Sequence, residues 1–237
     1  MQKVLFPMEY FRCTQDENTT GKTASHILSL AMDFGGKSGA TDDKLFAPCD
    51  MVCKKVRNDS SHEMYFESAG AVECADGYKG IVNFTFMHDN YINADVKVGK
   101  VFKQGEYFAD EGGFGRGVVD KFDRHTHIEV GKGASPMRQV PNEKGTYITK
   151  PQSHLYDIFF IAADTKVMNG KGNHTWKHTT DKLLDTSGNG SANESEDNMK
   201  VLSVFGASKG IKVQAFDTNR TGNATVNDVP DGDYVVE

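Results

Sequence analysis

Residues 124–130, which read Arg-His-Thr-His-Ile-Glu-Val, constrain the fold of this chain more than any other stretch. Alternate side chains of a β-strand point to the same face, and this run alternates polar with smaller or apolar residues. As a strand it would carry two histidines and a glutamate on one face, namely His125, His127 and Glu129. Two imidazoles on one face can divide the work of a hydrolytic zinc site, one binding the ion while the other moves protons.

The composition fits a β protein with long loops. The 237 residues include 24 Gly and 6 Pro, with 38% hydrophobic and 25% charged residues, which suits one sizeable domain and a small appendage. The formal net charge of −6 and the lack of a basic run argue against a nucleic-acid partner. No run of about 18 apolar residues is present, so we expect no membrane span.

The first ten residues lack the apolar core and the small-residue cleavage site of a secretory signal. We therefore expect synthesis in the cytoplasm, with any export by another route. The cysteines follow no Cys-x-x-Cys spacing, and reduced, partly buried thiols are the favoured interpretation over a disulfide framework. They are Cys13, Cys49, Cys53 and Cys74.

Several β-prone segments precede the histidine strand, and together they predict an antiparallel sheet. We expect a strand, a turn and a strand over residues 45–56, a strand over 63–68, a strand over 81–87 and a hairpin over 96–109 that turns at 103–105. The 81–87 strand is followed by His88, where a sheet offers side chains to a cleft. Glycines at 112, 113, 115 and 117 allow close backbone approach before the histidine strand and predict a flexible cleft wall.

Residues 25–36 hold a histidine and an aspartate seven positions apart, His26 and Asp33. Alternating apolar residues and the terminating Gly35-Gly36 favour a buried strand. Two residues at that spacing cannot be neighbours on one strand face, so a loop must carry His26 back over the strand that presents Asp33. Taken by itself, the segment favours a buried histidine and an aspartate at a turn before Gly35-Gly36 over a metal site.

The last third of the chain changes character. Residues 155–161 are an apolar run that predicts a short helix or strand closing the fold, and the one tryptophan, Trp176, reads as a packing anchor with His174 and His178 at the surface. We expect a main domain over 1–184, a polar Gly/Ser/Asn-rich linker over 185–198, and a small β module over 199–237. This module would bind the cell wall or mediate self-association.

Three motifs in order carry a family resemblance: Ser25-His26 with Asp33, then His88-Asp89-Asn90, then His125-x-His127 after the glycine cluster. Across residues 5–180 the chain resembles the lysostaphin-type (M23) zinc metallopeptidases, and most nearly the phage endolysins of that group. The resemblance implies an antiparallel β-sheet metallopeptidase core. It also implies one zinc ion held by His26, Asp33 and His127, with His88 and His125 as unligated catalytic histidines.

The spacing of the first motif is also compatible with a related group of zinc peptidases. The common bacterial pattern has its histidine and aspartate four apart, whereas the seven-residue spacing here is that of the phage branch and of the D-Ala-D-Ala-type peptidases. Their first motif matches His26, Ala31 and Asp33, with Ser29 in place of glycine. Those enzymes end on an upstream Glu and a Trp-His pair that are absent around His127, so the His-x-His strand favours the lysostaphin-type interpretation.

By resemblance the substrate is the peptide part of peptidoglycan, and the partner is the bacterial cell wall. Without a signal peptide, a phage lysin would reach the wall after a membrane pore opens, or as part of a virion. A catalytically inactive wall-binding relative and a cysteine amidase using Cys13 or Cys49 are the rival hypotheses. Glu129 is either a hydrogen-bond partner of a ligand imidazole or an ordinary surface residue.

Overall fold

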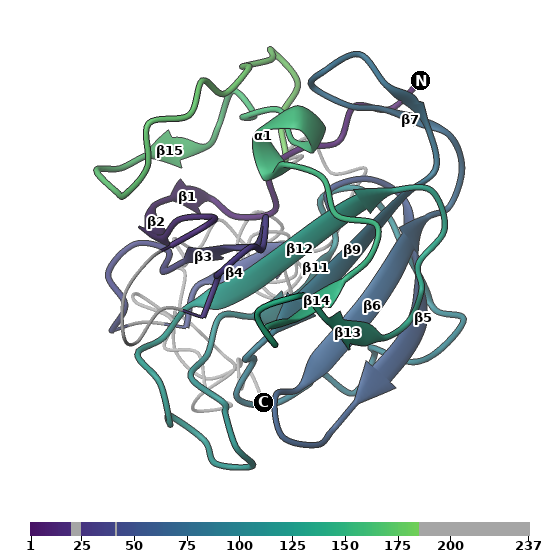
Figure 1. The fold of residues 1–237 in the computed structure, drawn as a ribbon. Coiled ribbons are helices and arrows are strands. Elements are labelled where there is room, and N and C mark those ends of the chain that lie inside the picture. Colours follow the sequence, from purple (N-terminus) through teal and green to yellow (C-terminus); the bar gives the residue numbers. More distant parts are fainter. Residues whose placement is uncertain (20–24, 41, 185–237) are drawn as a thin grey trace, which may run out of the picture. The chain divides into compact units, whose positions relative to one another are not determined.

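A computed structural model describes residues 1–19, 25–40 and 42–184 of the chain (Figure 1). The predicted linker at 185–198 and the predicted β module at 199–237 lie outside the described residues. Within the described residues no helix has the length and apolar character needed to cross a bilayer. The only helix among them is α1 (Leu155–Ile158), as expected for the apolar run at 155–161.

The centre of the fold is an antiparallel sheet of seven strands in the order β10-β5-β6-β9-β12-β3-β2 (Figure 1). The mainly-β prediction is confirmed. The strands are β2 (Cys13–Gln15), β3 (Met32–Phe34), β5 (Met51–Arg57), β6 (Glu63–Ser68), β9 (Val82–Met87), β10 (Val101–Phe102) and β12 (Thr126–Lys132).

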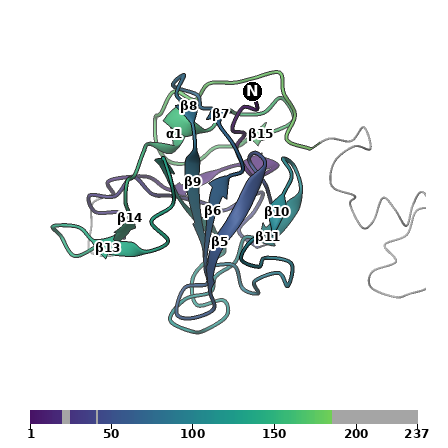
Figure 2. The same cartoon turned by 90° about the vertical axis from the view of Figure 1, so that its right-hand side faces the viewer.

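Within the part of the chain that the structure describes, four two-stranded sheets accompany this central sheet. Their members are β1 (Tyr10–Phe11) with β15 (Lys166–Val167), β4 (Lys44–Phe46) with β11 (Tyr107–Asp110), β7 (Val72–Glu73) with β8 (Lys79–Gly80), and β13 (Gln139–Pro141) with β14 (Tyr147–Thr149). Figure 2 shows β13 and β14 on one side of the long strands and β10 and β11 on the other.

The strand alternation places the hydrophobic core on one face of the central sheet. Phe66 of β6, Phe84 and Phe86 of β9, and Ile128 of β12 are fully buried there. Each such side chain contributes about 1.5–3 kcal/mol by leaving water. Trp176 packs on this core with its ring centroid 4.8 Å from that of Phe11, so it is the anchor that the sequence predicts. The opposite face of β9 and β12 is left for polar side chains.

The predicted hairpin over residues 96–109 is wrong. Its turn exists, because the Glu106 N–H donates to the Lys103 carbonyl at 2.8 Å and Gly105 has a φ of 80°. The two strands on either side, however, pair with different partners: β10 with β5, and β11 with β4. The segment from β4 to β5 runs through both sheets, so each half of the expected hairpin finds a neighbour there instead of its own other half.

The strand predicted within residues 25–36 is shorter than its alternation suggests. Regular pairing begins only at Met32, and Leu28 has a φ of 53° and is 43% exposed. A left-handed backbone at a leucine is uncommon and ends strand geometry. The preceding residues therefore form a loop, which is what allows His26 to return to Asp33.

All four cysteines are buried free thiols, in line with the reduced interpretation.

Candidate metal centre

The register of two strands sets the first part of the site. His127 of β12 lies directly opposite Asp33 of β3, so both side chains share the face away from the core. His26 reaches the same point from the loop before β3. Its Nε2 lies 3.1 Å from Nδ1 of His127 and 3.2 Å from Oδ1 of Asp33, and the His127 Nδ1 to Asp33 Oδ1 distance is 3.0 Å.

The outer hydrogen bonds of the two imidazoles decide which ring atoms face inward. The His26 Nδ1–H donates to the carbonyl of Asp16 at 3.1 Å, and the His127 Nε2–H donates to Oε1 of Glu129 at 3.1 Å. In their neutral forms, both rings therefore direct a lone pair toward the Asp33 carboxylate. Three acceptors this close repel one another unless a cation lies among them.

The electrostatics of the metal-free site agree with that requirement. Burial alone would lower the pKa of His127, but its hydrogen bonds to Asp33 and Glu129 raise the pKa to about 10. Burial likewise opposes the charged form of Asp33, yet the hydrogen bonds from His127 and His26 hold its pKa well below the usual value. A proton on His127 thus neutralises the cluster in the absence of a metal.

The donor set fits zinc. A tetrahedral Zn²⁺ with ligand bonds of about 2.0–2.1 Å separates its ligand atoms by about 3.3 Å, close to the 3.0–3.2 Å seen here. Two imidazoles with one carboxylate form the set that leaves a fourth position for water in hydrolytic zinc sites. His26, Asp33 and His127 are also grouped within 4.8 Å as candidate metal ligands among the described residues.

Glu129 is buried, not a surface residue, with 1% of its area exposed. Its Oε1 also accepts from Nε2 of Gln139 at 2.8 Å, and its Oε2 accepts the Thr149 N–H at 2.5 Å. Gln139 and Thr149 belong to β13 and β14, so this hairpin orients the carboxylate that in turn orients His127. Burial raises the pKa of Glu129, but the hydrogen bonds from His127 and Thr149 outweigh it and lower the pKa overall.

The two remaining predicted histidines lie beside this cluster. His88 follows β9 with a φ of 80°, and its Nδ1–H donates to the carbonyl of Phe114 at 2.8 Å. The His125 Nδ1–H donates to the carbonyl of Asp123 at 2.6 Å, and its Nε2 lies 3.9 Å from Oδ2 of Asp33. The two rings are 4.8 Å apart between centroids. Neither has a nitrogen directed among the three ligand atoms.

Burial and neighbouring imidazoles keep His88 neutral. Desolvation is the largest cause, and repulsion from His125 and His127 adds to it, lowering the pKa of His88 to about 3. The left-handed backbone at this residue is rare for a non-glycine residue and is of the kind that collects at functional sites. With Nδ1–H committed to a carbonyl, Nε2 of His88 is the acceptor.

The glycine cluster provides the close approaches that the sequence predicts. A Cβ at Gly112 would lie 2.3 Å from the main-chain nitrogen of Asn90, and one at Gly115 would lie 2.0 Å from the ring of Phe122. Phe122 in turn lies 5.4 Å from the His88 ring between centroids and is 39% exposed. The cluster thus brings an aromatic ring against the histidine pair.

Several contributors to the site carry no sequence signal. The carbonyls of Asp16 and Phe114 act through the main chain, which any residue supplies. Gln139 and Thr149 lie on a hairpin whose position over β12 is a tertiary feature. His174 was predicted at the surface, but it is half-buried and bonds to Asp16, while His178 is exposed as expected.

No family model matches this sequence, and no curated protein matches it. Solved structures do resemble it: a zinc-containing peptidase from Vibrio cholerae has a TM-score of 0.35 and 17% identity over 53% of this chain. A Ruminococcus gnavus protein that carries the name glycyl-glycine endopeptidase LytM has a TM-score of 0.33 and 12% identity over 62% of this chain. A structure of the SpoIIQ–SpoIIIAH pore-forming complex has a TM-score of 0.39 and 18% identity over 63% of this chain. The matches span 37%, 58% and 89% of those chains, respectively, and the likeness concerns the fold alone.

Proposed function

We propose that this chain is a zinc-dependent endopeptidase that hydrolyses peptide bonds of bacterial peptidoglycan. The observation that carries the proposal is the convergence of three acceptor atoms, from His26, Asp33 and His127, within 3.0–3.2 Å of one another. Two further imidazoles, those of His88 and His125, lie next to them. The lysostaphin-type resemblance of the sequence supports the substrate class.

The chain would hold zinc with two neutral imidazoles and one carboxylate. When bound, the ion supplies Lewis acidity that polarises the scissile carbonyl and lowers the pKa of a bound water to about 7. Asp33 contributes one negative charge, so the site keeps a net charge of about +1. Glu129 and the Asp16 carbonyl hold the two imidazoles in the tautomers that this ligation needs.

His88 and His125 carry out the proton chemistry in this proposal. Each has its Nδ1–H on a main-chain carbonyl, so the Nε2 of each is the atom that exchanges protons with the substrate. One of the two accepts a proton from the attacking water and returns it to the leaving amine, a role worth about 10²–10⁴-fold. The other donates to the developing oxyanion, worth about 2.7–4 kcal/mol by analogy with other oxyanion donors.

Digestion of purified cell wall tests the proposal. The protein is incubated with peptidoglycan with and without a chelator, and released fragments are identified by mass spectrometry. Cleavage inside stem or cross-bridge peptides that stops with chelator and returns with zinc is the expected result. Release only of terminal residues would assign a D-Ala-D-Ala-type carboxypeptidase instead, and binding to the wall without cleavage would assign an inactive relative.

The biological setting of this activity is a further part of the proposal. The likeness of the His26–Asp33 spacing to the phage branch supports an endolysin that lyses the wall from inside after a membrane pore opens, or a virion-attached enzyme. Lysis of cells that express the chain together with a pore-forming protein, and not of cells that express it alone, is the expected result for the endolysin.

A further inference from the structure

Two consecutive acidic residues, Asp16 and Glu17, are each paired with a histidine from the last part of the domain. Nε2 of His174 lies 2.7 Å from Oδ1 of Asp16, and Nδ1 of His154 lies 2.7 Å from Oε2 of Glu17. The paired residues are 158 and 137 positions apart in the sequence. The Glu17 side chain is only 8% exposed, so its charge is largely removed from water in this pairing.

Tyr156 of α1 joins the two pairs into one unit. Its ring stacks on His154 at 4.8 Å with an angle of 18°, and on His174 at 4.5 Å with an angle of 15°. Its hydroxyl donates to Oε1 of Glu17 at 3.4 Å. Three stacked rings and two carboxylates therefore fix residues 16 and 17, where the chain enters the turn at 17–18, from one side, and we call this set of five residues the His–Tyr–His clamp.

The clamped turn carries the hydrogen bond that orients a predicted zinc ligand. β2 ends at Gln15, so the carbonyl of Asp16 lies outside the sheet. That carbonyl accepts from Nδ1–H of His26 at 3.1 Å and also accepts from the hydroxyl of Thr19. No ladder hydrogen bond holds this peptide; its Glu17 N–H donates to Oδ1 of Asp16 at 2.9 Å, and the next main-chain bond runs from the Asn18 N–H to the Ser29 carbonyl at 3.0 Å. Side-chain contacts of Asp16 and Glu17 therefore contribute to the direction in which the Asp16 carbonyl points.

We propose that the His–Tyr–His clamp is a positioning device for the metal site, in which His154, Tyr156 and His174 act through Asp16 to set the tautomer and orientation of His26. This inference rests on the zinc site of the proposed function. Partners of a ligand imidazole tune metal affinity, and their loss typically costs about 10–100-fold. In this proposal, the zinc affinity of the site depends on His154, Tyr156 and His174, which do not themselves contact the metal or the substrate.

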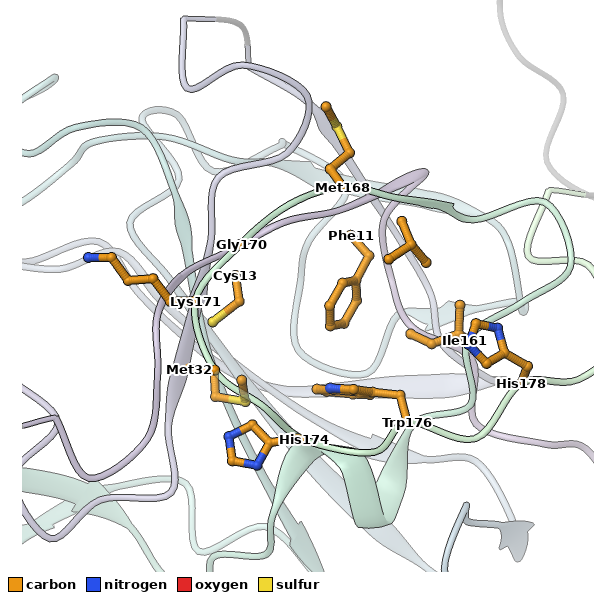
Figure 3. A pocket seen from close by; sticks show the side chains of 12 residues that line it. Phe11, Cys13, Met32, Ile161, Met168, Gly170, Lys171, His174, Trp176 and His178 are labelled. Atoms are coloured by element: carbon orange, nitrogen blue, oxygen red, sulfur yellow. The ribbon is translucent and has the colours of Figure 1, made fainter.

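The position of His174 makes it a suitable residue to change. It lies at the edge of a cavity of about 280 Å³ whose lining also includes Met32, Trp176 and His178 (Figure 3). Met32 precedes Asp33 on β3, so this cavity lies behind the metal face of the sheet. His174 is half-buried and does not belong to the hydrophobic core cluster, so we expect removal of its imidazole to widen this cavity without the loss of a core side chain.

The test measures zinc affinity by competition with a chromogenic chelator, and the visible spectrum of the cobalt-loaded protein. His174→Ala and Asp16→Ala are each expected to raise the zinc Kd by about 10–100-fold and to alter the cobalt spectrum. The double variant is expected to have the same zinc Kd as the single variant with the higher Kd, because both substitutions remove the same hydrogen bond between His174 and Asp16. His174→Gln, which retains an Nε2–H donor, is expected to restore affinity, and His178→Ala is the matched control with unchanged affinity.

Distinct outcomes overturn the inference. A wild-type Kd in His174→Ala, or additive losses in the double variant, would show that the clamp does not act on His26. A lower melting temperature of the metal-free variant with unchanged Kd would assign a purely structural role. Should His174→Ala fail to fold, His154→Ala tests the clamp from the Glu17 side. Wild-type protein that binds zinc but leaves peptidoglycan intact refutes the proposed substrate only, whereas absence of zinc binding refutes both.

Discussion

Replacement of Glu129 by glutamine tests how the buried carboxylate supports the metal site. Glu129 accepts from the His127 Nε2–H and lies across that ring from the ligand nitrogen, on the order of 7 Å from a metal ion bound there. A unit charge at that distance from a centre of net charge +1 contributes about 2 kcal/mol at an effective dielectric constant of about 20. Glu129 also stabilises the protonated His127 of the metal-free protein, which offsets part of this energy, so removal of the charge should raise the zinc Kd by up to roughly 30-fold.

The amide of a glutamine at position 129 cannot accept all the hydrogen bonds that the carboxylate accepts. One oxygen of Glu129 serves His127 and Gln139, and the other serves the Thr149 N–H. A glutamine places an NH₂ against one of these donors in either orientation, which adds about 1–3 kcal/mol of lost stability to the metal-free protein. Zinc affinity and unfolding of the metal-free protein must therefore be measured separately, by chelator competition and by chemical denaturation.

Glu63→Gln provides the matched control. Glu63 is also a buried carboxylate of the central sheet, and it accepts from Arg57 and Tyr65 instead of from a ligand. We expect this variant to lose stability with no change in zinc Kd. A folded Glu129→Gln protein whose zinc Kd stays within threefold of wild type would refute the assignment of Glu129 to the metal site.

Further predictions concern the ligands, the metal and one isolated carboxyl. Asp33→Ala and His127→Ala should abolish zinc retention and hydrolysis together. His88→Ala and His125→Ala should abolish hydrolysis while zinc remains bound, as measured by elemental analysis. Loss of metal from His125→Ala would show that His125, too, is a ligand and would reverse this division of roles. Zinc at 100 times its Kd should stabilise the domain by about 2.7 kcal/mol, a rise of roughly 5–10 °C in melting temperature that a chelator removes. Glu111 is fully buried; burial first, then repulsion from the neighbouring Asp43, raise its pKa to about 8 from 4.5. Because the folded pKa is the higher one, its contribution is fully present below pH 4.5 and is lost as pH rises toward 8, at about 1.4 kcal/mol per pH unit. Glu111→Gln should therefore raise the melting temperature at pH 8 but not at pH 4, and an equal shift at both would contradict the pKa assignment.

The sequence predicts those parts of the fold that are local. Alternation along residues 124–130 and 81–87 identifies β12 and β9, and the strand end at His88 follows directly. Such patterns report which side chains share a face of one strand, because the period of two is a property of the backbone. They do not report the neighbouring strand, which is why the sequence predicts a hairpin over residues 96–109 although β10 and β11 pair with other strands.

The site is less predictable than the strands for a related reason. The sequence brings His26 to Asp33 only by requiring an unspecified loop, and the left-handed backbone at Leu28 that creates this loop has no signature in a leucine. The main-chain carbonyls that accept hydrogen bonds from the imidazoles have no sequence signature either. The sequence around His174 likewise gives no sign of its contact with Asp16, which lies 158 positions away.

Strand register is the feature on which the whole metal centre depends. A slip of one residue between β3 and β12 would turn Asp33 into the core and remove it from the face of His127. Buried apolar residues prevent this slip, because Met32 and Phe34 on β3 would then be turned out toward solvent. The same core that stabilises the sheet thus fixes two of the three ligands. The third ligand, His26, gains nothing from this register, so its position must be supplied by the loop contacts that surround it.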